Sequence, residues 1–109
     1  MINLLIKNLS INTIGIKFVK ICFLDNTNFK YDSSYINSEK LRGAETVLIN
    51  LSRELNILGN QITIINNCPS SKVINNIEWK NINEINSAEN YDVVIANGDC
   101  RLFKYANSK

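Results

Sequence analysis

Apolar residues along this chain follow two spacings, one typical of buried strands and one typical of a helix. The segment "FVKICFL", which begins at Phe18, is apolar on both faces of an extended chain and predicts a buried, parallel strand. Helical spacing runs from Gly43 to Gly59. Its apolar positions are Ala44, Val47, Leu48, Leu51, Leu55 and Leu58. We expect this row to face the core, with Glu45 in the first turn and Gly59 ending the helix in a left-handed conformation.

Further strands are expected after this helix. "QITIINN" closes with polar residues before Pro69, a short strand spans Ile77 to Trp79, and "YDVVIANGD" predicts a strand over Asp92 to Ala96. Strand, helix and strand in this order define a right-handed βαβ crossover with parallel pairing. Segment 25–41 is expected to be a long loop, and "CRLFKYANSK" to begin a helix. The predicted fold class is α/β, a Rossmann-like three-layer unit with a mostly parallel sheet of about four strands.

The first 17 residues have a different pattern. Ile2, Leu5, Ile6 and Leu9 are spaced for one face of a short amphipathic helix, so residues 1–17 are predicted to be an extension and residues 18–109 a partial Rossmann-like lobe. The extension is a packing or linker segment, or alternatively an anchor at a membrane surface. Polar residues interrupt it too often for a transmembrane span. We expect a cytoplasmic protein, with association at the inner face of the membrane as the alternative.

Composition narrows the chemistry. The 109 residues favour a single domain, and 12 basic against 10 acidic side chains give a net charge of +2 without a basic cluster, which argues against nucleic-acid binding. The chain has no His, and Cys22, Cys68 and Cys100 are widely spaced, so neither a zinc site nor a disulfide framework is expected. Walker A, GxGxxG and GxSxG motifs do not occur, and we expect no cofactor.

In open α/β sheets, ligands bind at the carboxyl ends of the strands. Three such ends are polar here: the loop from Asp25 to Gly43, "NNC" after the second strand and "NGD" after the fourth. A glycine at a helix start admits a phosphate or carboxylate to the backbone N–H groups, but Gly43 could equally serve a tight turn alone. Asp25 and Asp99 would lie on neighbouring strands, either as a hydrolase pair or, as we favour, as loop-capping residues. Arg101 and Lys104 fit an anionic ligand or, more simply, a solvated helix face.

These segments together carry a family resemblance. "VKICFL", "RGAETVLINLSRELNILGNQITIINN" and "YDVVIANGD" resemble the amino-terminal part of a family 4 glycosyltransferase of the GT-B class, over about Val19 to Phe103. The resemblance implies the acceptor lobe of a two-lobed retaining enzyme, of the kind that assembles cell-envelope polysaccharides, which moves a sugar from a nucleotide-sugar donor to a glycan or lipid acceptor without a metal. The implied phosphate- and substrate-binding residues are Arg42, Gly43, Ala44, Asn97, Gly98 and Asp99. Arg42 stands where the family has a first Gly, and Asn60 where it has a His.

The chain also lacks groups that the family uses. It has no His and no second lobe to supply the cations that bind the donor phosphates, so we predict that it transfers no sugar alone. The leading hypothesis is an incomplete GT-B amino-terminal lobe that needs its missing carboxyl-terminal lobe. Two alternatives stay open: a noncatalytic flavodoxin-like binding or interaction module, and a half-enzyme completed by a separate polypeptide. An incomplete lobe should expose apolar surface, whereas a finished module should not.

Overall fold

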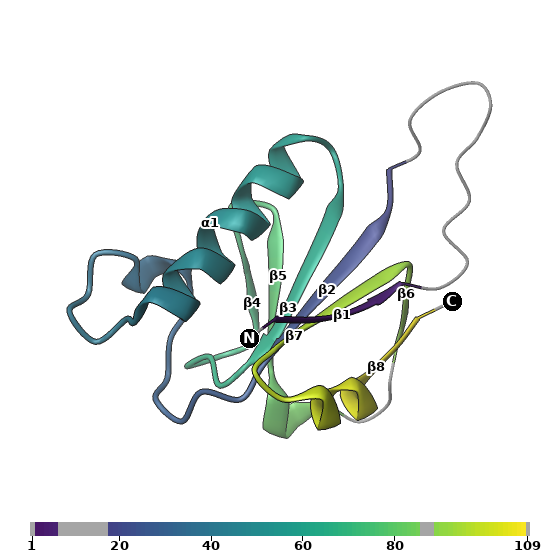
Figure 1. Cartoon of the computed structure of the whole chain (residues 1–109). Coiled ribbons are helices and arrows are strands. Elements are labelled where there is room, and N and C mark those ends of the chain that lie inside the picture. The colour runs from purple at the N-terminus through teal and green to yellow at the C-terminus, as the bar shows by residue number, and fades with distance from the viewer. Residues whose placement is uncertain (1, 7–17, 86–88, 109) are drawn as a thin grey trace.

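A computed structural model describes residues 2–6, 18–85 and 89–108 of the chain (Figure 1). Six strands form one sheet in the order β1-β7-β2-β3-β5-β4. Their bounds are β1 Ile2–Ile6, β2 Lys20–Asp25, β3 Gln61–Asn66, β4 Lys72–Ile74, β5 Ile77–Asn81 and β7 Val93–Asn97. β6 (Glu89–Tyr91) and β8 (Ala106–Ser108) pair separately in parallel. One α-helix, α1 (Gly43–Ile57), and 3-10 turns η1 (Ser33–Tyr35), η2 (Ile82–Glu84) and η3 (Cys100–Tyr105) complete the described elements.

The predicted βαβ unit is confirmed. β2 and β3 pair in parallel, with α1 between them in the sequence, and β7 and β5 extend the parallel part on either side. Only the edge strands β1 and β4 run antiparallel to their neighbours. Over the described residues the chain is therefore an α/β unit with a mostly parallel sheet and one α-helix, which is compatible with a Rossmann-like arrangement.

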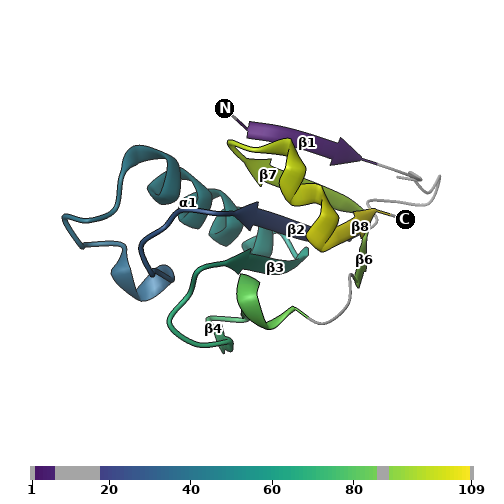
Figure 2. The ribbon, with the colours of Figure 1, turned by 90° about the horizontal axis from the view of Figure 1, so that it is seen from below.

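The helix α1 packs on one face of the sheet and the 3-10 turn η3 on the other. Ile21 and Phe23 of β2 point into the core that α1 covers, whereas Cys22 and Leu24 point into a second core that includes Leu102 of η3. Figures 1 and 2 show α1 lying against the sheet and η3 beside β7 and β2. Because both faces are covered, β2 is apolar and buried at every position from Ile21 to Leu24, as the sequence predicted.

The predicted face of α1 is confirmed at Leu48, which is buried, and at Leu55, which packs against the core, but it is wrong at other positions. The helix buries Leu48 and Ile49 together with two polar residues, Glu45 and Ser52. Val47, Leu51 and Leu58, which the sequence placed in the core, are exposed, with 51%, 36% and 68% of their surface accessible. At 100° per residue this exposed stripe lies about 120° around the helix from the buried one. α1 thus has a second apolar stripe that no described residue covers.

The amino-terminal helix prediction is also wrong where it can be compared. Ile2–Ile6 form strand β1, which pairs antiparallel with β7, and Leu9 lies outside the described residues. Five residues give too few intrahelical hydrogen bonds to offset helix nucleation, while β7 offers them a complete row of backbone partners.

Two other elements differ from expectation. Asn75 and Asn76, both with positive φ, join β4 to β5 in a tight hairpin that the sequence analysis missed. At the other end, the helix expected from "CRLFKYANSK" is only the 3-10 turn η3, which gives way to β8. None of the described helices has the length and apolar content to cross a bilayer.

Candidate functional site

All four parallel strands end in an Asp or Asn residue. β2 ends in Asp25, β3 in Asn66, β5 in Asn81 and β7 in Asn97. The register sets Asp25 beside Asn97, and Asn66 beside Asn81. Amide and carboxylate groups therefore form a row along one edge of the sheet, where ligands of open α/β proteins bind.

A pocket of about 580 Å³ opens at one half of this edge. Its wall is formed by residues 25–28 after β2, by Arg42, Ala44 and Glu45 at the start of α1, and by Asn97 and Gly98 at the end of β7. The predicted residues Arg42, Ala44, Asn97 and Gly98 are thus brought together, although 53 positions separate Ala44 from Asn97. The volume suits a monosaccharide or a similarly small polar molecule.

Gly43 lies at the start of α1 and leaves its surroundings open. A Cβ built on Gly43 would meet no atom within 4 Å, and its φ is not in the left-handed region, unlike that of Gly59 and Gly98. The preceding residue, Arg42, makes no side-chain capping hydrogen bond to the helix. The tight-turn explanation for Gly43 therefore lacks support, because its backbone conformation is one that any residue can adopt.

Asp25 is one of two buried carboxylates in the wall of the pocket, the other being Glu45. Its Oδ2 accepts a short hydrogen bond from the Tyr31 hydroxyl, and its Oδ1 accepts from Thr27 N at 3.2 Å, Thr27 Oγ1 at 3.0 Å and Asn97 Nδ2 at 3.5 Å. Burial and the Asp25 charge raise the pKa of Tyr31, so the phenol remains a donor at any ordinary pH. These contacts fix the Asp25 carboxylate, and the Thr27 bond is the loop-capping role that the sequence favoured.

The charges of the pocket are nearly balanced. Arg42 Nε lies 3.0 Å from Oε1 of the buried Glu45, whereas Asp25 accepts hydrogen bonds from the neutral residues Thr27, Tyr31 and Asn97. Two carboxylates and one guanidinium leave a formal charge of −1. Such a lining hydrogen-bonds to hydroxyl groups but does not by itself attract a free anion.

Asp99, the last predicted site residue, faces a different and smaller pocket. This pocket of about 200 Å³ is lined by Asp99, Arg101, Lys104, Tyr105 and others, and Asn26 belongs to the walls of both pockets. Asp99 caps η3 by accepting from Arg101 N at 2.9 Å and pairs with Arg101 Nη2 at 2.8 Å. These hydrogen bonds lower the pKa of Asp99. Asp25 and Asp99 are therefore both loop caps, and they do not share one pocket as a hydrolase pair requires.

Sequence reasoning assigned no site role to Thr27 or Glu45, which line the first pocket, or to Tyr31, which does not line it but is buried and donates to Asp25. Thr27 and Tyr31 lie in the loop after β2, where no periodicity marks a position, and Glu45 was explained by the helix dipole alone. A signal existed for Glu45, since Arg42 precedes it by three residues and an ion pair at this spacing is common at a helix start.

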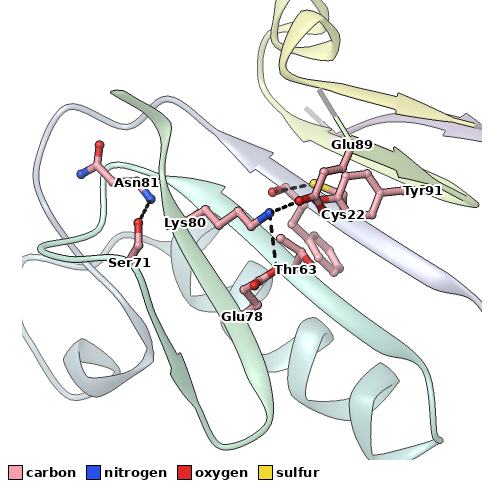
Figure 3. A network of polar contacts seen from close by, with 9 residues as sticks. Cys22, Thr63, Ser71, Glu78, Lys80, Asn81, Glu89 and Tyr91 are labelled. Carbon is pink, nitrogen blue, oxygen red and sulfur yellow. Dashed lines mark hydrogen bonds and ion pairs between the residues drawn. The ribbon is translucent and has the colours of Figure 1, made fainter. Parts of the chain in front are cut away.

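A second group of polar side chains lies on the sheet face opposite α1 (Figure 3). Lys80 Nζ is 2.7 Å from Glu89 Oε1 and 3.6 Å from Glu78 Oε1, and the Tyr91 hydroxyl donates to Glu89 at 3.2 Å. Burial acts to lower the pKa of Lys80, but the two carboxylates outweigh it and raise that pKa; the Lys80 bond lowers the pKa of Glu89. A groove of about 440 Å³ borders this group. Because Lys80 of β5 contacts Glu89 of β6 as well as Glu78, we interpret the group of polar side chains as a tie between β5 and β6.

The remaining candidates for chemistry are weak. No group of three or more His, Cys, Asp or Glu residues able to hold a metal occurs among the described residues. Cys22 and Cys68 are buried, and burial raises the pKa of both thiols, which keeps them from acting as thiolate nucleophiles.

Comparison with known proteins found no relative: no protein-family model, no curated protein and no solved structure matches this chain.

Proposed function

We propose that this chain is the acceptor-side lobe of a retaining glycosyltransferase of the GT-B class, which receives a sugar from a nucleotide-sugar donor held by another lobe. The observation that supports this proposal best is the 580 Å³ pocket, in which the loop after β2, the start of α1 and the end of β7 meet. The start of α1 and the end of β7 belong to the segments on which the sequence resembles the family, and the loop follows the strand that carries "VKICFL".

The lining of the pocket suits a sugar. A sugar ring presents adjacent hydroxyl groups that both donate and accept hydrogen bonds, and carboxylate, amide and guanidinium groups are complementary to them. Asp25 is buried and held by Tyr31, so its carboxylate is already oriented before a ligand binds. The free space at Gly43 would let the donor diphosphate approach the first amides of α1, where the helix dipole favours negative charge.

The same charges argue that the chain needs a second lobe. Bond cleavage at the donor leaves a diphosphate that must be stabilised by fixed positive charge. Among the described residues that line the pocket, Arg42 is the one cation, and it already pairs with Glu45. The exposed stripe of Val47, Leu51 and Leu58 also fits a lobe that packs against more protein. We therefore expect no sugar transfer by this chain alone, and donor-dependent transfer to any glycan would contradict the incomplete-lobe proposal.

An amide-resolved NMR titration tests the sugar pocket. We expect methyl α-glucoside and UDP-glucose to shift the amides of Ala44 and Gly98 with millimolar affinity, and Asp25→Asn to weaken this response. Asp32→Asn is the matched control, because Asp32 is an equally buried loop aspartate that caps η1 and lines neither this pocket nor its neighbour. A pocket silent to every sugar, or a tight complex with FMN, would reject the proposal; the second outcome favours the flavodoxin-like alternative.

A further inference from the structure

The pocket beside Asp25 and the pocket beside Arg101 are neighbours of opposite charge. Asn26 lines both, so the two form a continuous surface at the carboxyl end of β2 and β7. The larger pocket holds two carboxylates and one guanidinium, whereas the smaller holds Arg101 and Lys104 against the single carboxylate of Asp99. The larger pocket, with a formal charge of −1, therefore favours neutral hydroxyl groups, and the smaller pocket, with a formal charge of +1, favours an anionic group.

The cations of the smaller pocket are accessible to solvent. Arg101 is 87% exposed although it pairs with Asp99, and Lys104, whose Nζ lies 5.2 Å from the centre of the Tyr105 ring, is exposed as well. Behind them, Leu102 is buried in the second core and holds η3 against the sheet. The two charges thus stand on an anchored turn next to the sugar pocket.

From this arrangement we infer that the acceptor is an anionic sugar, whose hydroxyl groups bind beside Asp25 and whose phosphate or carboxylate group binds at Arg101 and Lys104. This inference rests on the proposed function and specifies its acceptor class. Phosphate and carboxylate share the chemistry that matters here, because a guanidinium and an ammonium group recognise the anionic oxygens of either. The carboxylates near the sugar ring oppose binding of the anion in the larger pocket and so set the orientation of the ligand.

Binding by the intact chain tests this inference. The probes are methyl α-glucoside, glucose 1-phosphate, methyl glucuronide and inorganic phosphate, each titrated and followed by NMR. We expect at least one of the two anionic sugars to bind about tenfold more tightly than methyl α-glucoside, and the advantage to shrink as NaCl rises from about 50 to about 500 mM. Whether glucose 1-phosphate or methyl glucuronide gains more identifies the anionic group.

A pair of double variants locates the effect. Arg101→Gln with Lys104→Gln should remove the tenfold advantage and leave binding of methyl α-glucoside within about twofold of the parent. Lys30→Gln with Lys40→Gln removes the same charge from two exposed positions that line neither pocket, and should leave the advantage intact. If both double variants lose equally, the effect is that of net charge and the inference fails.

The remaining outcomes separate the inference from the proposed function. Equal binding of charged and uncharged sugars overturns the inference and leaves the sugar pocket standing. Inorganic phosphate binding as tightly as glucose 1-phosphate also overturns it, because the sugar ring then contributes nothing. If no sugar binds at all, the proposed function fails and the inference fails with it.

Discussion

Gly43, the first residue of α1, and Gly59, two residues after its end, should respond in opposite directions to substitution by alanine. Gly43 has an ordinary φ and open space around it, so Gly43→Ala adds a methyl group without a clash. Because alanine loses less backbone entropy than glycine, we expect stabilisation by about 0.5 kcal/mol, less than in a helix interior. Gly59 has a φ of 104°, and a Cβ there would lie 2.6 Å from Cε1 of Phe18.

For Gly59→Ala the backbone conformation dominates. A side chain in this region costs about 1–2 kcal/mol, while the Phe18 ring, which is 62% exposed, can move aside at smaller cost. The two variants should therefore differ by roughly 2 kcal/mol, or about 8–16 °C in Tm for a domain of this size. Urea and thermal unfolding followed by circular dichroism measure both quantities.

The result for Gly43→Ala decides whether this glycine is required by the fold or by a ligand. If Gly43→Ala destabilises the protein by as much as Gly59→Ala, the glycine is required by the fold, and the free space beside it says nothing about a ligand. If Gly43→Ala is stable but loses the response of the pocket to UDP-glucose, the fold tolerates the methyl group and binding does not, as we expect of a residue kept small for a ligand.

Three further predictions follow from other parts of the molecule. Val47→Lys combined with Leu58→Lys should reduce self-association in analytical ultracentrifugation without lowering Tm, because both side chains are exposed; unchanged association would show that this stripe is not the adhesive surface. Tyr31→Phe should cost about 1–3 kcal/mol in urea unfolding, since a buried carboxylate loses its hydroxyl donor, and a neutral effect would refute that bond. Because folding lowers the pKa of Glu89, the pair stabilises the protein above about pH 4.5, and this contribution is lost as the pH falls through the pKa of Glu89 in the folded protein. Because folding raises the pKa of Lys80, the stabilisation on the alkaline side is lost only above about pH 10.5. Lys80→Met should therefore cost less than about 1 kcal/mol, since Glu89 is half exposed, and this cost should be constant from pH 5 to 9 and vanish in acid.

The sequence predicted the centre of the parallel sheet well, because β2 and β7 are covered on both faces and contain unbroken apolar runs. The residues from Ile21 to Leu24 allow few other structures, and their pairing with β3 followed from the length of the intervening helix. The start of α1 and the end of β7 were likewise placed correctly, which is why four predicted site residues line one pocket.

Other features depend on partners that spacing does not reveal. The apolar side chains of α1 surround most of the helix, so periodicity alone could not decide between the stripe of Val47 and Leu51 and that of Leu48 and Ile49. Ile2–Ile6 become a strand because β7 lies beside them. In each case a tertiary contact overrides a local preference.

The polar residues at the carboxyl ends of the four parallel strands have two different roles. Asn66 Nδ2 donates to the Tyr31 carbonyl at 2.9 Å, and Asn81 Nδ2 donates to the Cys68 carbonyl at 2.7 Å, so these two side chains tie down the connecting segments. Asp25 and Asn97 remain beside the pocket. A ligand therefore binds to a wall whose connecting segments are already ordered, so the loss of protein conformational entropy on binding is small.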